Sequence, residues 1–185
     1  KSVATDPFSG GRNFGNHCSR HEWNVVPIHS NIETQYLNAL GSGIAQKQHC
    51  GKGLTIVNGG DAGSAEGDFA SCLVWASRPG NELPMLIIVT NNDWGISTPR
   101  ETQHGDKRIS DRGNAFGMKT LNINGNDVEE SWFALQEAMT YIRKERKPVA
   151  VALANKMARI AWKLLVSGEN YDPRRSKVRA LDKAA

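Results

Sequence analysis

Two short runs of apolar residues limit most strongly what this chain can fold into. Residues 85–89 read Met-Leu-Ile-Ile-Val without a break, and residues 54–57 form a shorter run that stops at Asn58-Gly59-Gly60. A continuous apolar run of this length is typical of a parallel strand that is covered on both faces, whereas a strand with one wet face shows alternation. The longer run therefore predicts a central parallel strand, and the shorter run a second buried strand.

The rest of the chain supplies helices and further strands at regular spacing. Helices are predicted for 34–48, 66–78 and 127–146, the last from a capping-box-like start at Asp127 and Glu130. Further strands are predicted for 119–123 and 149–153. This alternation favours an α/β fold, an open, mostly parallel sheet with helices on both faces. The polar connection 91–113 has a length that is typical of functional or mobile loops.

Apolar positions also predict which side of each helix is buried. The first helix has its apolar residues on one face: Leu37, Leu40, Ile44 and Ala45. The second is expected to turn Phe69, Leu73 and either Trp75 or Ala76 inward. Small residues at 41–43 should let the first helix approach its neighbour closely.

Length, hydrophobicity and cysteines set further limits. The 185 residues suffice for one domain with a sizeable core. No segment approaches the ~20 apolar residues that cross a bilayer, so no membrane partner is expected. The chain starts at Lys1 rather than Met, and we expect its natural start to be missing. Cys18, Cys50 and Cys72 give an odd number without metal-ligand spacing, which favours free thiols and a cytoplasmic location.

Positive charge is concentrated at the end of the chain. The formal net charge is +4, but residues 155–185 hold eight Lys or Arg against three Asp or Glu, so residues 1–154 are close to neutral. A basic tail is usually just solvated, and a basic average should not be taken as a nucleic-acid signal for the whole protein.

The segments that follow the two apolar runs contain the residues with chemical potential. Asp61 lies among Gly59, Gly60 and Gly63, and Asn92 lies 31 residues further along, after the second run. In a parallel sheet both segments leave at the carboxyl edge, where α/β folds bind their ligands. Glycines let backbone N–H groups approach an anion, and the helix that begins near Glu66 directs its positive end to the same place.

Carboxylate and amide oxygens are ligands that Mg²⁺ accepts when substrate phosphates complete its octahedral shell. The pattern therefore predicts a diphosphate bridged to the protein by Mg²⁺. The Gly-Lys-Ser/Thr of a nucleotide phosphate loop is absent here, as is a dinucleotide glycine fingerprint. Taken singly, each residue has a simpler explanation, because Asp after a strand often caps a helix and Asn-Asn is a common turn.

The wider sequence resembles the alpha subunits of the first component of 2-oxo acid dehydrogenases, of branched-chain or pyruvate type. Asp61 and Asn92 resemble the two ends of a thiamine diphosphate motif, Gly-Asp-Gly and Asn-Asn. The segment HSNIETQYLNALGSGIAQK (29–47) resembles the family's Ser-Ser-Pro-x-Ala-Thr-Gln helix entry. Further segments follow in family order over residues 6–148: SGGRNFGNH (9–17), GGDAGSAEGDF (59–69), NNDWGISTP (91–99), RISDRGNAFGM (108–118) and INGNDV (123–128).

The resemblance implies a thiamine diphosphate-binding fold and a role for each matching position. Asp61, Asn92 and the backbone carbonyl of Trp94 match Mg²⁺ ligands. The residues that match the cofactor-binding segments are Gly60, Ala62 and Gly63, along the diphosphate, and Ser30 and Ile32, which flank the bent cofactor. Thr34 and Gln35 match a K⁺ site of some members. His17 has two open interpretations, a residue of the substrate channel with a catalytic role or the cap of a loop.

The implied reaction is oxidative decarboxylation of a 2-oxo acid, with acyl transfer to the lipoyl group of an acyltransferase second component. The implied assembly is an α₂β₂ heterotetramer, in which the beta subunit supplies a glutamate to the active site. Arg108 and Arg112, in the long connection, are candidate contacts of the beta subunit or of the acyl carrier.

Three departures from the family pattern stand out. Ala62 replaces a glycine, Thr90 stands where some relatives place a diphosphate-binding arginine, and no histidine follows His104 although the family has a late histidine segment. Residues 149–173 instead resemble the C-terminus of insertion-element transposases, and a helix is predicted over 157–168. We therefore divide the chain into a truncated dehydrogenase domain, 1–153, and a helical basic tail of foreign appearance, 154–185.

Three functions remain open. The chain is either an enzyme subunit that works with its beta partner, a catalytically inactive cofactor-binding or interaction module of the same fold, or a DNA-associated fusion. Only the tail favours the third, without a DNA-reading motif, so nucleic acid is not an expected partner.

Overall fold

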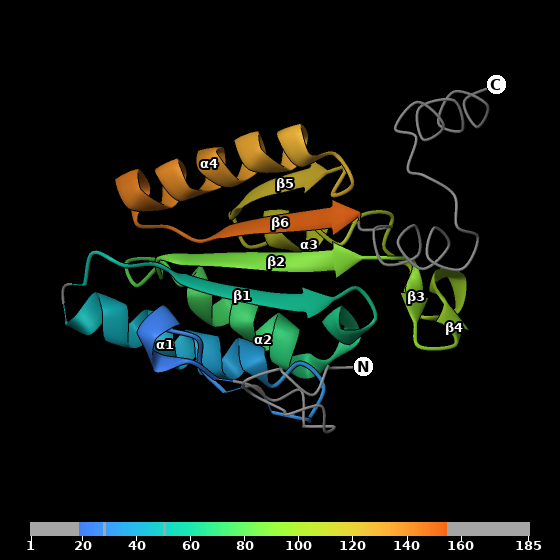
Figure 1. The fold of residues 1–185 in the computed structure, drawn as a ribbon, viewed down its shortest axis with the longest axis horizontal. Helices are drawn as coiled ribbons and strands as arrows, with labels where there is room; N and C mark the ends of the chain where they lie inside the picture. The colour runs from blue at the N-terminus through green and yellow to red at the C-terminus, as the bar shows by residue number, and fades with distance from the viewer. Residues whose placement is uncertain (1–18, 28, 50, 155–185) are drawn as a thin grey trace, which may run out of the picture.

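A computed structural model of the protein describes residues 19–27, 29–49 and 51–154 (Figure 1). Its helices are α1 (Gln35–Gln48), α2 (Gly67–Ala76), α3 (Asp111–Asn114) and α4 (Val128–Glu145). Its strands are β1 (Thr55–Gly60), β2 (Met85–Asn91), β3 (Trp94–Gly95), β4 (Thr98–Pro99), β5 (Lys119–Ile123) and β6 (Val149–Ala154). Three short 3₁₀ helices complete it: η1 (His21–Trp23), η2 (Gly63–Ala65) and η3 (Arg100–Thr102).

The four long strands form one parallel sheet in the order β1-β2-β6-β5. The uninterrupted apolar strand β2 lies between β1 and β6, as its composition predicts. All four strands point the same way in Figure 1, so the segments that follow them leave at one edge. The α/β fold with a parallel sheet, expected from the alternation of elements, is confirmed.

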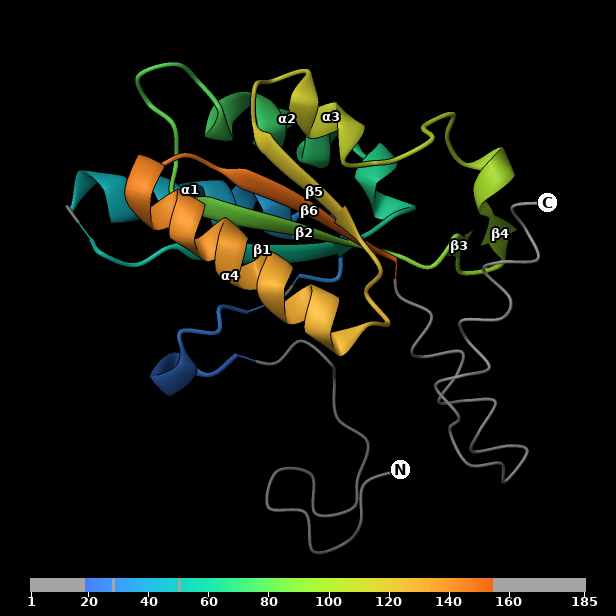
Figure 2. The ribbon, with the colours of Figure 1, turned by 90° about the horizontal axis from the view of Figure 1, so that it is seen from above.

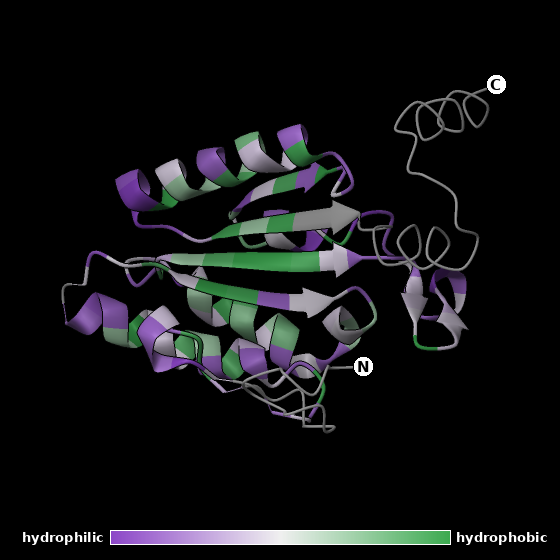
Figure 3. Ribbon diagram, in the orientation of Figure 1, coloured by the Kyte–Doolittle hydropathy of each residue, from purple (hydrophilic) through white to green (hydrophobic). Residues whose placement is uncertain are grey.

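Side chains of β2 alternate between two apolar cores, one on each face of the sheet. Met85, Ile87 and Val89 join the core formed with α1, α2 and the region of α3. Leu86 joins the core formed with α4, and Ile88 packs against that core. Figure 2 shows α4 on one side of the sheet and α2 and α3 on the other, and Figure 3 shows the hydrophobic residues gathered along β2. Because both faces are covered, β2 tolerates no polar residue before Thr90.

The buried side of α1 differs from the predicted one. Leu37 and Ile44 are 42% and 39% exposed, and of the predicted face only Leu40 is buried. The remaining inward positions are Tyr36, Ala39 and Gly43. Tyr36 packs edge-on against Phe69 of α2, with ring centroids 5.0 Å apart. A Cβ at Gly43 would lie 3.0 Å from Met85 Sδ, so small residues bring the helix close to the sheet, and close approach overrides the larger apolar side chains.

The ends of the elements differ in detail from the predictions. β1 does not stop at Asn58 but continues through Gly60, because parallel pairing to β2 satisfies its backbone. On α2, Ala76 is buried and Trp75 is 51% exposed. Asp127 caps α4 as predicted, and its side chain accepts from the N–H groups of Glu129 and Glu130 at 3.0 Å each.

The polar connection after β2 is folded rather than open. It contains the β3-β4 hairpin, η3 and α3. Within the described ranges, none of the helices combines the length and the apolar character that a membrane span requires. The helix predicted over 157–168 and the boundary at 153/154 lie at or outside the end of the described residues.

Candidate functional site

The ends of β1 and β2 bring the two predicted motif segments together. Gly60 is in register with Thr90, and the Asp61 N–H donates to the Thr90 carbonyl oxygen at 3.1 Å. The segment from Gly59 to Ser64 and the segment from Asn91 to Gly95 therefore start side by side at the carboxyl edge of the sheet (Figure 1). This is the position in α/β folds where ligands bind.

Asp61 is the most unusual residue at this edge. It is 2% exposed, and its Oδ2 is buried without a hydrogen-bond partner. The turn around it is fixed by its own carbonyl oxygen, which accepts from Ser64 Oγ at 2.6 Å and from the Ser64 N–H at 3.2 Å. An unpaired carboxylate oxygen away from water is costly unless a cation binds it. The donor set thus fits a hard divalent ion such as Mg²⁺.

The segment after β2 is shaped by two side-chain turns. Asn91 Oδ1 accepts from the Asp93 N–H at 3.0 Å, and Asn92 Oδ1 accepts from the Trp94 N–H at 2.8 Å. Asp93 and Ile96 have positive φ values of 61° and 58°. Because an amide oxygen has two lone pairs, Asn92 keeps one for a further partner. Within the described residues no cluster of three His, Cys, Asp or Glu side chains forms.

Ala62, the first departure from the family motif, packs directly against the second segment. Ala62 has φ −61° and ψ −44°, a conformation that any residue adopts. A Cβ built on Gly95 would lie only 2.6 Å from the Ala62 Cβ. The Ala62 methyl group therefore fits because residue 95, on the other motif segment, is a glycine. The two motif segments pack against each other at this point.

The remaining predicted cofactor residues lie in the turn before α1. Ser30 and Ile32 are exposed, Ile32 at 66%. Gln35 Nε2 donates to the Asn58 carbonyl oxygen on β1 at 3.3 Å, which fastens this turn to the strand. Thr34 lies at the N-terminal end of α1. His17 falls outside the described residues.

Thr90, the second departure from the family pattern, is neutral and so cannot offset the charge of a diphosphate as an arginine at this position would. Its Oγ1 donates to Asn58 Oδ1 at 3.1 Å.

Glu33 is a site residue that the sequence analysis missed. It is 6% exposed, although it precedes a helix on a surface turn, and its φ of 65° is in the left-handed region. Its Oε1 accepts from the Gly60 N–H at 3.3 Å and its Oε2 from Gln35 Nε2 at 3.1 Å. Burial raises the pKa of this carboxyl, and the hydrogen bond from Gly60 opposes that rise. The sequence does contain a signal for this residue, because Glu33 stands where the family's helix-entry motif, Ser-Ser-Pro-x-Ala-Thr-Gln, has alanine.

The connection after β2 folds back onto the site through Arg112. Its guanidinium donates to the Ser64 carbonyl oxygen and to the Asp106 carboxylate. Asp106 also lies 3.5 Å from His104 Nδ1, and that histidine side chain is 5% exposed. Arg108 differs, because it is 62% exposed and its ion pair with Asp111, at 3.2 Å, lies on the surface. Of the two predicted partner contacts, Arg112 is thus already engaged within the chain, whereas Arg108 is accessible.

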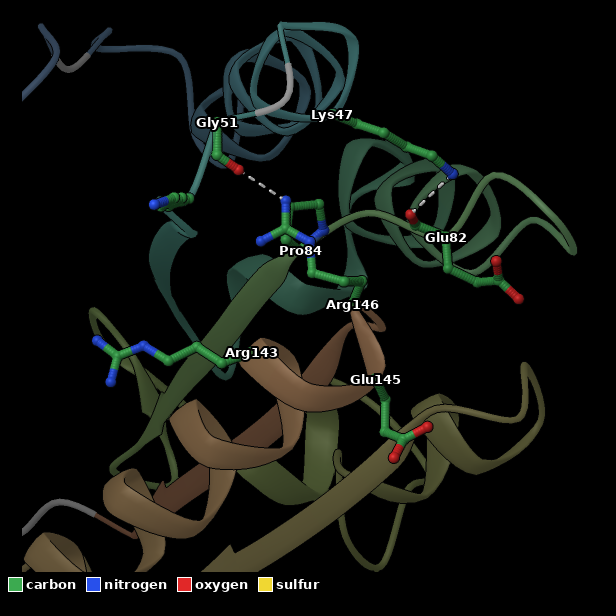
Figure 4. A pocket seen from close by; sticks show the side chains of 8 residues that line it. Lys47, Gly51, Glu82, Pro84, Arg143, Glu145 and Arg146 are labelled. Atoms are coloured by element: carbon green, nitrogen blue, oxygen red, sulfur yellow. Dashed lines mark hydrogen bonds between the residues drawn. The ribbon is translucent and has the colours of Figure 1, made fainter.

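An open cleft of about 560 Å³ lies at the opposite, amino edge of the sheet. Two of its basic side chains bind within the protein (Figure 4): Arg146 donates to the Gly51 carbonyl oxygen at 2.9 Å and Lys47 to the Glu82 carbonyl oxygen at 3.3 Å. None of the side chains that line this cleft is a buried carboxylate without a hydrogen-bond partner. We therefore place the candidate site at Asp61.

Comparisons with known proteins agree with the observed fold. A solved transketolase from Leishmania mexicana superposes with a TM-score of 0.58 at 20% identity, over 70% of this chain and 20% of that one. At this identity the likeness shows the fold alone. It confirms that the parallel sheet and its helices are arranged as in that enzyme.

Sequence relatives are more specific. The alpha subunit of 2-oxoisovalerate dehydrogenase of Dictyostelium discoideum is 34% identical over 76% of this chain, and that of Bacillus subtilis is 31% identical over 80%. The pyruvate dehydrogenase E1 component alpha subunit of Acholeplasma laidlawii is 30% identical over 69% of this chain. The chain spans 32%, 44% and 36% of the length of these relatives. The profile of the family described as "Dehydrogenase E1 component" matches residues 4–155, and the chain belongs to this family.

Proposed function

We propose that this chain is an alpha-subunit fragment of a 2-oxo acid dehydrogenase that binds thiamine diphosphate through Mg²⁺ at the carboxyl edge of its sheet. The observation that carries the proposal is the buried Asp61 carboxylate, whose Oδ2 has no hydrogen-bond partner, in a chain of the E1 component family. The relatives named above are alpha subunits of branched-chain and pyruvate dehydrogenases. The reaction is then oxidative decarboxylation of a 2-oxo acid, with acyl transfer to a lipoyl carrier.

In this proposal each part of the site has a separate task. Asp61, the Asn92 amide oxygen and the Trp94 carbonyl oxygen hold Mg²⁺, and Gly60, Ala62 and Gly63 present backbone to the diphosphate. Ser30 and Ile32 border the cofactor, and Thr34 and Gln35 are the K⁺ ligands if that ion binds. Thiamine diphosphate, when bound, supplies the electron sink for decarboxylation. The chain's own residues position its diphosphate through backbone N–H groups and metal-bound oxygens.

The partners follow from the family. We infer a beta subunit in an α₂β₂ assembly and a lipoyl-bearing acyltransferase as acceptor of the acyl group. The exposed Arg108 is a candidate contact for one of them. The cytoplasmic location stays a prediction, and it agrees with the free, buried thiol of Cys72, whose pKa burial raises to about 12.

Calorimetric titration of Mg²⁺–thiamine diphosphate into the chain co-purified with a beta subunit tests the proposal. We expect saturable binding that Asp61→Ala abolishes and that Asp111→Ala, at an exposed acid paired with Arg108, leaves intact. Circular dichroism melts establish that both variants are folded. Saturable binding that survives Asp61→Ala would contradict the assigned metal ligand, and no binding by the folded wild type would contradict the cofactor.

A second candidate, a cofactor-binding module without turnover, is favoured by one observation. No histidine follows His104, whereas the family that the chain resembles has a late histidine segment that serves the cofactor phosphates and the acylation step. Decarboxylation of a 2-oxo acid measured with saturating cofactor separates the two candidates. Cofactor binding without CO₂ release from the complete assembly would support the module.

A further inference from the structure

We propose that the carboxylate of Glu33 is an internal anion that occupies the glycine-lined edge of β1 and competes there with an incoming diphosphate. The inference rests on the proposed function in one respect, since it takes the glycine segment from Gly59 to Gly63 as the diphosphate side of the site. It adds a residue that sets the affinity of this chain for its anionic ligand.

The contacts of Glu33 place its carboxylate against three glycines. Gly60 donates its N–H to Glu33 Oε1 at 3.3 Å. A Cβ built on Gly63 would lie 1.8 Å from Oε1, and one built on Gly59 would lie 2.3 Å from Oε2. At positions 59 and 63 only a residue without a side chain leaves room for the carboxylate, whereas Gly60 contributes its N–H. Glycine at these positions thus accommodates Glu33 in the absence of ligand.

The same features suit a diphosphate oxygen. A backbone N–H beside glycines is a donor that a phosphate approaches closely, and here a carboxylate oxygen accepts from it. Two of the residues assigned to the diphosphate, Gly60 and Gly63, are those that Glu33 contacts most closely. Two anions at one buried location repel each other with little screening by salt. Binding of a diphosphate therefore requires Glu33 to leave or to be neutralised.

Glu33 is placed so that it can leave. Its backbone has φ 65°, a conformation that is strained for a residue with a side chain, and it is flanked by the exposed Ile32 and the half-buried Thr34. Its side chain accepts hydrogen bonds from Gly60 and Gln35, and its carbonyl oxygen accepts from the Tyr36 N–H at 3.1 Å. A turn of this kind can change conformation without unpacking α1 from the sheet.

A purely structural role is the competing explanation. Glu33 accepts from Gly60 while Gln35 donates to Asn58, so both side chains satisfy backbone groups of β1. In that role the shape and the acceptor oxygen matter, and the charge does not. Glu33→Gln keeps both and removes only the charge, whereas Glu33→Ala removes all three and restores the alanine of the helix-entry motif.

The test is calorimetric titration of the full chain with Mg²⁺–inorganic diphosphate and, separately, with Mg²⁺–thiamine diphosphate. We expect Glu33→Gln and Glu33→Ala to bind inorganic diphosphate at least about ten-fold more tightly than the wild type, because a like charge at hydrogen-bonding range is removed. The matched control is Glu145→Gln, the same chemical change at the amino edge of the sheet. Thermal melts of each variant report its fold and stability.

The outcomes are separable. Equal diphosphate affinity in the wild type and both Glu33 variants, including undetectable binding in all three, overturns the proposed competition. Glu33 then has the structural role alone, accepting from the backbone of β1, and a lower Tm of Glu33→Ala is expected. A ten-fold gain confined to the Glu33 variants supports it. If the Glu33 variants gain affinity for inorganic diphosphate while the chain co-purified with a beta subunit binds no thiamine diphosphate, the proposed cofactor fails and the role of Glu33 stands.

Discussion

At the amino edge of the sheet, Lys47 and Arg146 donate to backbone carbonyl groups, whereas at the carboxyl edge Asp61 Oδ2 is buried with no partner. Lys47 and Arg146 thus bind within the protein itself. The Asp61 oxygen is available for a bound cation, because a buried carboxylate that is not compensated costs stability. A large cleft with satisfied side chains is thus a weaker sign of function than a small site with an unsatisfied one.

The two edges also differ in what their backbone strain achieves. Arg146 has φ 55° at the end of α4, where a left-handed residue closes many helices. Glu33 and Asp93 have φ 65° and 61° in turns that lead into the candidate site. Strain at the amino edge ends a helix, and strain at the carboxyl edge positions side chains against the strand ends, in the manner expected of binding sites.

The largest effect should come from Asp61→Asn, which tests whether Asp61 is kept for binding at the expense of stability. Neutralising a buried carboxylate that lacks a partner should raise the free energy of unfolding by about 1–3 kcal/mol. The same change should weaken Mg²⁺-dependent cofactor binding by about 100-fold or more, since a neutral amide is a poorer ligand of Mg²⁺. Urea unfolding and calorimetry measure the two effects. If Asp61→Asn lost stability and bound the cofactor unchanged, Asp61 would be a structural residue rather than a metal ligand.

The second effect concerns the contact that joins the two motif segments. Gly95→Ala should destabilise the protein by about 1–3 kcal/mol, because the new methyl meets the Ala62 Cβ at 2.6 Å. Ala62→Gly should rescue Gly95→Ala, since it removes the other methyl. The double-mutant cycle in urea therefore gives a favourable coupling energy. Additive effects of the two substitutions would show that the segments are not packed together.

The strands and α1 show why part of this fold could be predicted from the sequence and part could not. The strand 85–89 was predictable because five apolar residues have no other stable environment, and 119–123 was predicted with its observed bounds. The buried face of α1 was not, because it depends on how closely Gly43 lets the helix approach Met85, which is a property of the packed pair. Larger apolar residues on the other side gave a misleading stripe.

The candidate site divides in the same way. Asp61 and Asn92 were predictable as neighbours, because parallel strands deliver their carboxyl ends to one edge. The Ala62–Gly95 contact was not, since Gly95 lies 33 residues further along the chain, on the segment that follows β2. Glu33 lies 27 residues from Gly60 on a separate turn, so only the folded chain reveals that its carboxylate accepts from Gly60.

The smallest effect is expected at the amino edge, where Arg146 has a structural task alone. Arg146→Ala removes the hydrogen bond to the Gly51 carbonyl oxygen and keeps a side chain at φ 55°, which should cost about 1–2 kcal/mol of unfolding free energy. Arg146→Gly loses the same bond but relieves the left-handed backbone, so it should be more stable than Arg146→Ala by roughly 1 kcal/mol. Urea unfolding of the two variants gives this difference. Because Arg146 binds within the chain and far from the carboxyl edge, diphosphate affinity should be equal in both variants and in the wild type. A change in affinity would mean that the two edges are coupled through the sheet.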